Sequence, residues 1–173
     1  MPVFIVGTWG ENGVANAMNA AWGGISEENE ISICVSADHK TTKNVLASGA
    51  FTVSVADAEN VVAADYVGIV SANKVPDKIA KCGWSEQKSE FVNAPIFNQL
   101  PFVLECKLVS YDKERCRLVG EIVNVSADER ILTDGKVDLS KFNPITYDPS
   151  NHDYVALGKK VGKAFSDGKK IEN

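Results

Sequence analysis

Two alternating segments in the second half of the chain constrain its fold more than any other feature. In residues 102–109, the side chains at every second position are apolar and those between them are mixed. A second extended segment, residues 118–125, follows after a polar turn at residues 112–115. A period of two is typical of a β-strand with one buried face, and a polar turn between two such runs indicates an antiparallel hairpin. Glu105 and Glu121 lie inside these strands, so we expect each carboxylate to have solvent or a hydrogen-bonding partner.

The first half of the chain contains extended and helical patterns in alternation. The Asn12-Gly13 step is a strong hairpin signal, and Gly49 is suited to end a helix. We expect strands at residues 3–8, 18–22, 31–36 and 51–55, and helices at residues 41–48, 60–70 and 76–81. Several short strands with helices between them favour a mainly β fold, a β-barrel with peripheral helices, over a regular βαβ array.

The composition is that of one globular domain. The chain has 173 residues, of which 45% are apolar and 24% charged, so residues 1–173 are treated as a single domain. The net charge of −5, from 18 basic and 23 acidic residues, argues against nucleic-acid binding, which favours a basic face. No apolar run approaches the ~20 residues that a membrane-spanning helix needs, so we expect no membrane partner.

The cysteines and the first residues bear on the cellular compartment. The four cysteines, Cys34, Cys82, Cys106 and Cys116, are far apart and form no CxxC pair, so neither a metal site nor a redox pair is indicated. Their apolar neighbours favour reduced, mostly buried thiols. The N-terminal residues lack a basic leader, and we therefore expect a cytoplasmic protein.

Positive charge is unevenly distributed. Between Met1 and Asn73 the only cations are Lys40 and Lys43, against eight acidic side chains. At the other end, five lysines between residues 159 and 170 oppose Asp167 and Glu172, which leaves a local charge of +3. We interpret the C-terminal run as a solvated face, whereas the isolated pair of lysines needs a separate explanation.

The loop around those two lysines has the chemistry of an anion site. Residues 36–44 connect a strand to the start of a helix, where free N–H groups and the helix dipole favour negative charge. Thr41 and Thr42 add hydroxyl donors and Lys40 and Lys43 add charge, as a phosphate monoester would require. The alternative is that one of the threonines caps the helix and the lysines are merely solvated.

A second candidate segment is Asn19-Ala20-Ala21-Trp22-Gly23-Gly24. Its small residues allow a flat ligand to approach the backbone, and the Asn19 amide offers both a donor and an acceptor. Trp22 would then line or stack on the ligand, the alternative being that it belongs to the core.

Signatures of acid–base or nucleophilic catalysis are missing. The sequence contains no GxSxG, GxxxxGK[ST], GxGxxG or HExxH motif. His39 and His152 each neighbour an aspartate, but adjacent residues of an extended chain point to opposite faces and make no ready dyad. We therefore assign no catalytic acid or base, and we interpret His152 as an exposed loop residue.

Taken together, these segments resemble the flavin reductase-like family, and within it the flavoredoxin branch. The matching elements, in chain order, are residues 16–22, 36–44, 48–55, 77–79, 104–106, 119–123, 144–147 and 154–158. Each is short, but their order and spacing together are specific to the family. The resemblance implies an FMN-binding split β-barrel of six strands that pairs as a homodimer, with FMN near the subunit interface.

The resemblance also implies roles for particular residues. Asn19, Ala20, Ala21 and Trp22 would lie along the isoalloxazine ring, and Ser36, Ala37, His39, Lys40, Thr41, Thr42 and Lys43 would hold the ribityl and phosphate end. Asp77-Lys78 and Tyr147 or Tyr154 would close the pocket. The expected function is that of an NAD(P)H-dependent flavin reductase, in which NAD(P)H binds transiently in the flavin cleft. The alternative is an electron carrier of the flavoredoxin type that exchanges electrons with protein partners, and a third reading is a flavin-free module.

Overall fold

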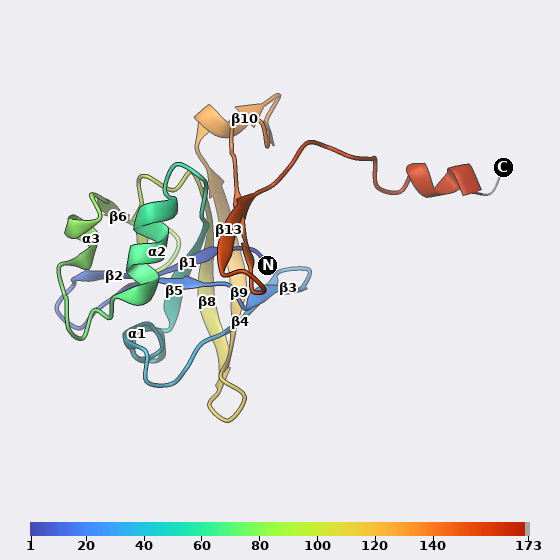
Figure 1. The fold of residues 1–173 in the computed structure, drawn as a ribbon. Coiled ribbons are helices and arrows are strands. Elements are labelled where there is room, and N and C mark those ends of the chain that lie inside the picture. The colour runs from blue at the N-terminus through green and yellow to red at the C-terminus, as the bar shows by residue number, and fades with distance from the viewer. Residues whose placement is uncertain (172–173) are drawn as a thin grey trace.

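The computed structural model describes residues 1–171, and its centre is a curled, fully antiparallel sheet of seven strands (Figure 1). The strands run in the spatial order β2-β1-β5-β8-β9-β4-β3, so β2 and β3 are the two edges. Their bounds are β1 Phe4–Trp9, β2 Ala15–Ala20, β3 Gly23–Glu27, β4 Glu30–Cys34, β5 Ala50–Val55, β8 Phe102–Asp112 and β9 Arg117–Ala127. The short link between β2 and β3 therefore joins the two edges of the curl.

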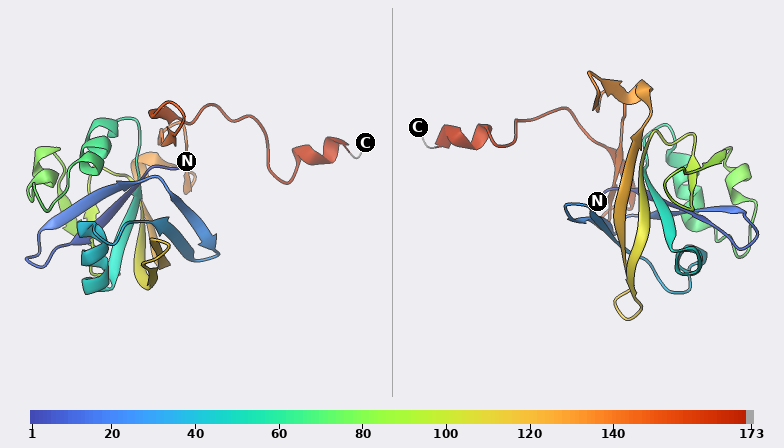
Figure 2. Two further views of the ribbon diagram at one scale, coloured as in Figure 1. Left: turned by 60° about the horizontal axis from the view of Figure 1, so that its bottom comes forward. Right: turned by 180° about the vertical axis from the view of Figure 1, so that it is seen from behind.

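Helices and small hairpins surround this sheet. The helices are α1 Lys40–Ser48, α2 Val61–Ile69 and α3 Lys78–Lys81, with short 3-10 turns at Glu129–Ile131 and Asp167–Ile171. The pairs of short strands are β6 Glu86–Lys88 with β7 Pro95–Phe97, β10 Leu132–Thr133 with β11 Lys136–Val137, and β12 Ile145–Asp148 with β13 Asp153–Ala156. Figure 2 shows α2 and α3 together on one side of the sheet and the C-terminal segment standing away from the body. None of the described helices is long and apolar enough to cross a membrane.

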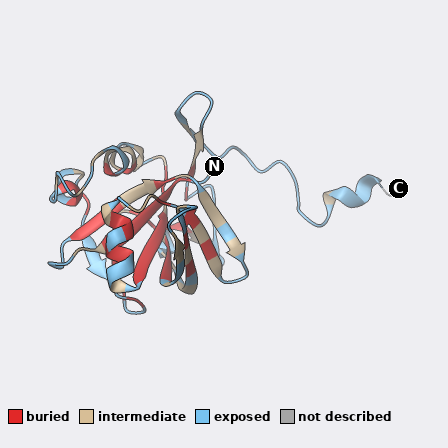
Figure 3. Ribbon diagram, turned by 90° about the horizontal axis from the view of Figure 1, so that it is seen from below, coloured by how far each residue is buried: buried red, intermediate tan, exposed pale blue. Residues whose placement is uncertain are grey.

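Strand β1 is buried on both faces because helices cover one side of the sheet and the curl closes the other. Val3 and Ile5 pack in a cluster with Val67 of α2, whereas Phe4 and Val6 pack inside the curl. This accounts for the continuous apolar run at the start of the chain, and Figure 3 shows the buried residues concentrated in the sheet strands.

Most of the expected elements are present, with different limits. The long hairpin is confirmed as β8 and β9, and the helix at residues 41–48 begins one residue earlier and ends where Gly49 adopts a φ of 70°. Helix α2 is confirmed, whereas the expected helix at residues 76–81 spans only Lys78–Lys81. The second strand ends at Ala20, and residues 23–27 form an additional strand on β4, which gives seven strands where six were expected.

The cysteines differ from expectation in burial. All four are free thiols, but only Cys106 is buried, and Cys34 is exposed. The expectation of mostly buried thiols is therefore wrong, because Cys34 ends β4 and Cys116 lies in the turn before β9.

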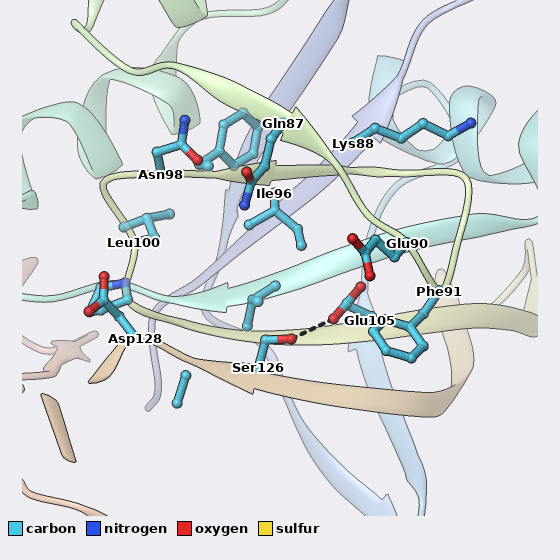
Figure 4. A pocket seen from close by; sticks show the side chains of 14 residues that line it. Gln87, Lys88, Glu90, Phe91, Ile96, Asn98, Leu100, Glu105, Ser126 and Asp128 are labelled. Atoms are coloured by element: carbon cyan, nitrogen blue, oxygen red, sulfur yellow. Dashed lines mark hydrogen bonds between the residues drawn. The ribbon is translucent and has the colours of Figure 1, made fainter. Parts of the chain in front are cut away.

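Glu105 is a fully buried carboxylate that the fold satisfies with hydrogen bonds. Ser89 Oγ donates to its Oε2, and Asn124 Nδ2 and Ser126 Oγ donate to its Oε1 over 2.6 and 2.7 Å. It borders a hollow of about 370 Å³ (Figure 4). The expectation that both hairpin glutamates need a partner or solvent is confirmed, since Glu121 is exposed.

Replacement of Glu105 should therefore destabilise the protein. Glu105→Ala leaves three donors without their acceptor, and we expect the free energy of unfolding to fall by about 2–4 kcal/mol in urea titrations. Glu121→Ala on the neighbouring strand is the matched control, with a change within about 0.5 kcal/mol. Equal effects of the two variants would contradict this role for the Glu105 network.

Candidate functional site

The first of the two segments singled out by sequence pairs with the strand that leads into the second. The backbone carbonyl of Trp22 accepts a hydrogen bond from Cys34 N over 2.7 Å, and Gly23 pairs with Ile33 in the β3–β4 ladder. The end of β4 leads directly into the loop that begins at Ser36. Backbone pairing thus brings two separate segments of the sequence together.

A buried polar ladder fastens helix α1 to the end of β1 and the start of β2. Asn16 Nδ2 donates to Thr41 Oγ1 over 2.8 Å and to Thr8 Oγ1 over 3.2 Å, and Asn44 Nδ2 donates to Thr8 Oγ1 over 3.0 Å. All four side chains are buried. Because buried polar groups must be paired, this ladder sets the position of the helix against β1 and β2.

The N-terminus of α1 is left without a side-chain cap. His39 stands at the N-cap position in an extended conformation, its side chain makes no capping hydrogen bond, and the first turn holds no acidic residue. Thr42 Oγ1 donates instead to the Ser36 carbonyl over 2.7 Å, and Thr41 Oγ1 accepts from Asn16. The alternative that a threonine caps the helix is therefore wrong, and the donors at the helix start remain suited to an anion.

The hydroxyls and cations of this loop are not equally accessible. Thr41 and Thr42 are both buried, and the proton of Thr42 is already committed to Ser36. Ser36, Ala37 and Lys40 are half-buried, whereas His39 and Lys43 are exposed. Lys40 borders a hollow of about 280 Å³ together with Asn16 and Asn44.

Trp22 is exposed rather than part of the core. Its relative exposure is 58%, and with Ala21 it lines a hollow of about 390 Å³ that also includes Cys34, Arg115 and Arg117. The core alternative for this residue is thus wrong.

The arginines of this hollow were not singled out by sequence. Arg117 Nε donates to Ser32 Oγ over 2.9 Å, which orients the guanidinium across β4, and Arg115 pairs with Asp112 over 3.1 Å. They reach Trp22 only because Arg117 pairs with Cys34 in the β4–β9 ladder. Neither periodicity nor spacing in the sequence signals that pairing.

Asn19 and Ala20 face opposite sides of β2. Ala20 belongs to the cluster inside the curl, whereas Asn19 Nδ2 donates to the Ala64 carbonyl of α2 over 3.0 Å and to Tyr154 Oη over 3.2 Å. A Cβ on Gly68 would meet Asn19 Cβ at 2.9 Å, so a glycine in α2 allows this close approach. Both amide protons of Asn19 are used within the protein, which leaves its Oδ1 to serve as an acceptor.

Tyr154 and Tyr147 lie together beyond Asn19. Tyr154 Oη donates to Asp65 Oδ1 over 2.9 Å, and the two tyrosine rings are 6.0 Å apart. Tyr147 Oη is 2.8 Å from Nδ1 of His152, which is an exposed loop residue as expected. Desolvation, followed by the hydrogen bond to Asp65, raises the pKa of Tyr154 to about 12.

Asp77 and Lys78 serve local structure. Lys78 Nζ donates to the carbonyls of Val67 and Val70 over 2.9 and 2.8 Å, at the end of α2, and burial lowers its pKa to about 8. Asp77 forms an ion pair with Lys81 over 3.2 Å. Lys78 therefore holds the end of a helix, and its charge is directed at backbone carbonyls. Within residues 1–171, no group of three or more His, Cys, Asp or Glu could hold a metal ion.

The raised pKa of Tyr154 can be tested by titration. Its pKa lies above the ordinary 10.0, so the stabilisation of the protonated form is complete below pH 10 and is lost as pH rises toward about 12. The difference between the ultraviolet titrations of the wild type and Tyr154→Phe should isolate one tyrosine that ionises near 12. Asp65→Asn should lower that value, and a Tyr154 component that titrates near 10.0 in the wild type would contradict the geometry.

Comparison with known proteins places this geometry in context. The model of the family described as "Flavin reductase like domain" matches residues 1–155. Among the curated proteins, none matches the chain.

Solved structures with the same fold include three informative neighbours. Flavoredoxin of Desulfovibrio vulgaris (Miyazaki F) is 35% identical with a TM-score of 0.92, over 97% of this chain and 92% of that one. Flavoredoxin from Methanosarcina acetivorans is 27% identical with a TM-score of 0.90, over 99% and 92%. An FMN-binding domain of a flavin reductases-like enzyme from Shewanella baltica is 19% identical with a TM-score of 0.84, over 94% and 88%, and shows the fold alone. The expected fold, a mainly β split barrel with peripheral helices, is confirmed.

Proposed function

Because this chain belongs to the flavin reductase-like family, we propose that it is an FMN-binding redox protein that accepts electrons from NAD(P)H. The observation that carries the proposal is that the exposed Trp22 pairs through its backbone with the end of β4, the strand that leads into the uncapped start of α1. One feature suits a phosphate and the other suits a flat ring, and FMN has both.

The residues present fit FMN. The start of α1 offers backbone N–H groups, the helix dipole and the cations Lys40 and Lys43, in a first turn without acidic residues. A phosphate dianion there would replace the missing cap. We assign the ribityl and phosphate end to Ser36, Ala37, His39, Lys40, Thr41, Thr42 and Lys43.

The contributions of these residues differ. Lys43 is exposed and free to turn toward a phosphate, and Lys40 reaches it from a half-buried position. Thr41 retains a hydroxyl proton to donate, since its oxygen only accepts from Asn16. Thr42 acts by holding the Ser36 carbonyl and so the shape of the loop.

The ring end is assigned to Asn19, Ala20, Ala21 and Trp22, with Ala20 contributing through its backbone because its side chain packs inside the curl. Trp22 supplies an exposed aromatic face, and Ala21 keeps the approach open. Asn19 acts through its Oδ1, because Ala64 and Tyr154 fix the orientation of its amide. When bound, FMN supplies the redox chemistry, taking a hydride or single electrons at its ring system.

The hollow beside Trp22 is suited to the electron donor. Arg115 and Arg117 are two of the chain's three arginines, and both line it. Guanidinium groups bind phosphates through paired hydrogen bonds, and NAD(P)H carries a pyrophosphate. The binding would be transient, because the sequence has no dinucleotide fingerprint of its own.

A second candidate function is an electron carrier that keeps its FMN and exchanges electrons with protein partners. The observation behind this alternative is the 35% identity to a flavoredoxin, which supports it no more than the family model supports the reductase. We further propose that residues 1–173 act as one cytoplasmic domain that pairs as a homodimer.

Lys43 should contribute directly to FMN affinity. Charge-assisted hydrogen bonds contribute roughly 1.5–3 kcal/mol, so Lys43→Ala should weaken FMN binding about 10- to 150-fold in fluorescence titrations of the apoprotein. Lys88→Ala, at an exposed lysine on β6, is the matched control and should leave the affinity unchanged. An unchanged affinity for Lys43→Ala would move the phosphate elsewhere.

Anaerobic mixing of the FMN-loaded protein with NADH or NADPH separates the two candidate functions. Rapid bleaching of the flavin absorption is expected for the reductase, whereas indifference to both nucleotides supports the carrier. Arg117→Gln should raise the nucleotide concentration needed for half-maximal bleaching at least tenfold. Arg130→Gln, which changes the one arginine outside the hollow, should not.

A further inference from the structure

Residues 157–171, which we call the C-terminal arm, extend away from the rest of the chain, and several apolar side chains of the arm are exposed to solvent. The arm stands away from the sheet in every view that includes it (Figures 1 and 2). The relative exposures are 97% for Val161, 99% for Phe165 and 90% for Ile171. Single exposed apolar residues are ordinary, but three that are almost completely exposed on one short segment mark a contact surface.

The body carries an apolar groove at the root of this arm. Its volume is about 560 Å³, and all but one of its lining residues are apolar. Three of the apolar lining residues, Val137, Leu139 and Leu157, are themselves exposed to solvent. The same three residues also line a hollow of about 1130 Å³ beside residues 158–162, so the groove continues along the start of the arm.

The arm's own fold keeps it out of its own groove. Beyond Gly162 the chain makes a local turn, in which Lys163 N donates to Asp167 Oδ2 over 2.7 Å and Lys170 pairs with Asp167 over 2.9 Å. Phe165 lies within this turn, and its almost complete exposure means that the groove of the same chain does not bury it. The groove and the Phe165 side chain are therefore apolar surfaces of one chain that do not meet.

Charge favours a second copy as the occupant. The whole chain has a net charge of −5 and residues 157–173 contribute +3, which leaves −8 for the rest. A positively charged arm is attracted to the negatively charged body of a neighbour, whereas two such bodies alone repel each other.

We propose that each arm lies in the apolar groove of a second copy, in a reciprocal exchange across a twofold axis. The inference rests on the proposed pairing of two copies and names the segment that holds them together. Phe165 is eight residues beyond Leu157, so an extended arm carries it up to ~28 Å from the groove of its own chain. When two chains exchange identical arms, both apolar grooves are filled and no groove or arm is left over, as a closed twofold assembly requires.

Crosslinking between two variants that each carry one introduced cysteine tests the exchange. In a background with Cys34→Ser, Cys82→Ser and Cys116→Ser, which leaves only the buried Cys106 of the native thiols, chains with Phe165→Cys are mixed with chains with Leu139→Cys and allowed to exchange subunits. A short bismaleimide should give a covalent product of twice the chain mass. Val62→Cys, at an exposed apolar residue on α2, replaces Leu139→Cys in the control and should give none.

Three results would overturn the proposal. The first is a crosslink within a single chain that carries both Phe165→Cys and Leu139→Cys, because the arm would then occupy its own groove. The second is a dimer whose dissociation constant, from sedimentation equilibrium, is unchanged in a chain that ends at Leu157, where we expect at least a tenfold rise. The third is a wild-type chain that is monomeric throughout. Flavin content, read from the visible spectrum, tests FMN binding separately.

Discussion

The buried amide of Asn16 holds the functional end of this molecule together. Its two hydrogen bonds, to Thr8 on β1 and Thr41 on α1, tie the helix to the sheet at a place buried from solvent. Because Thr41 lies in the first turn, the same bonds fix the free N–H groups at the start of α1. An anion site built from backbone groups needs such an anchor, since its donors cannot reorient individually.

The second constraint is the antiparallel pairing of β4 with β9. It brings Arg117 beside Cys34, and Cys34 in turn bonds to the carbonyl of Trp22. Through these contacts, the loop after β4 and the link between β2 and β3 share one end of the curled sheet. The proposed cofactor, with a dianion at one end and a flat ring at the other, matches a site assembled from a helix start and an exposed aromatic residue. No acid or base is required of the protein, because the redox chemistry belongs to the cofactor.

Sequence patterns predicted what depends on local periodicity. The β8–β9 hairpin, the helix that ends at Gly49 and the buried glutamate in need of partners all followed from alternation, turns and residue type. What could not be predicted depends on pairing between distant segments. The arginines beside Trp22 are set by strand register, and the partners of Asn19, the Ala64 carbonyl and Tyr154 Oη, are set by the packing of distant segments against β2. Strand β3 was missed because two glycines and a polar stretch obscure its alternation.

The central claim is that a phosphate occupies the start of α1, and the comparison of FMN with riboflavin tests it most directly. The two ligands share the ring and the ribityl chain and differ only in the phosphate. Calorimetric titration of the apoprotein should give an affinity for FMN at least about 100-fold higher than for riboflavin, since two charge-assisted hydrogen bonds contribute roughly 3 kcal/mol or more. Equal affinities for the two ligands, or no binding of either, would contradict the account.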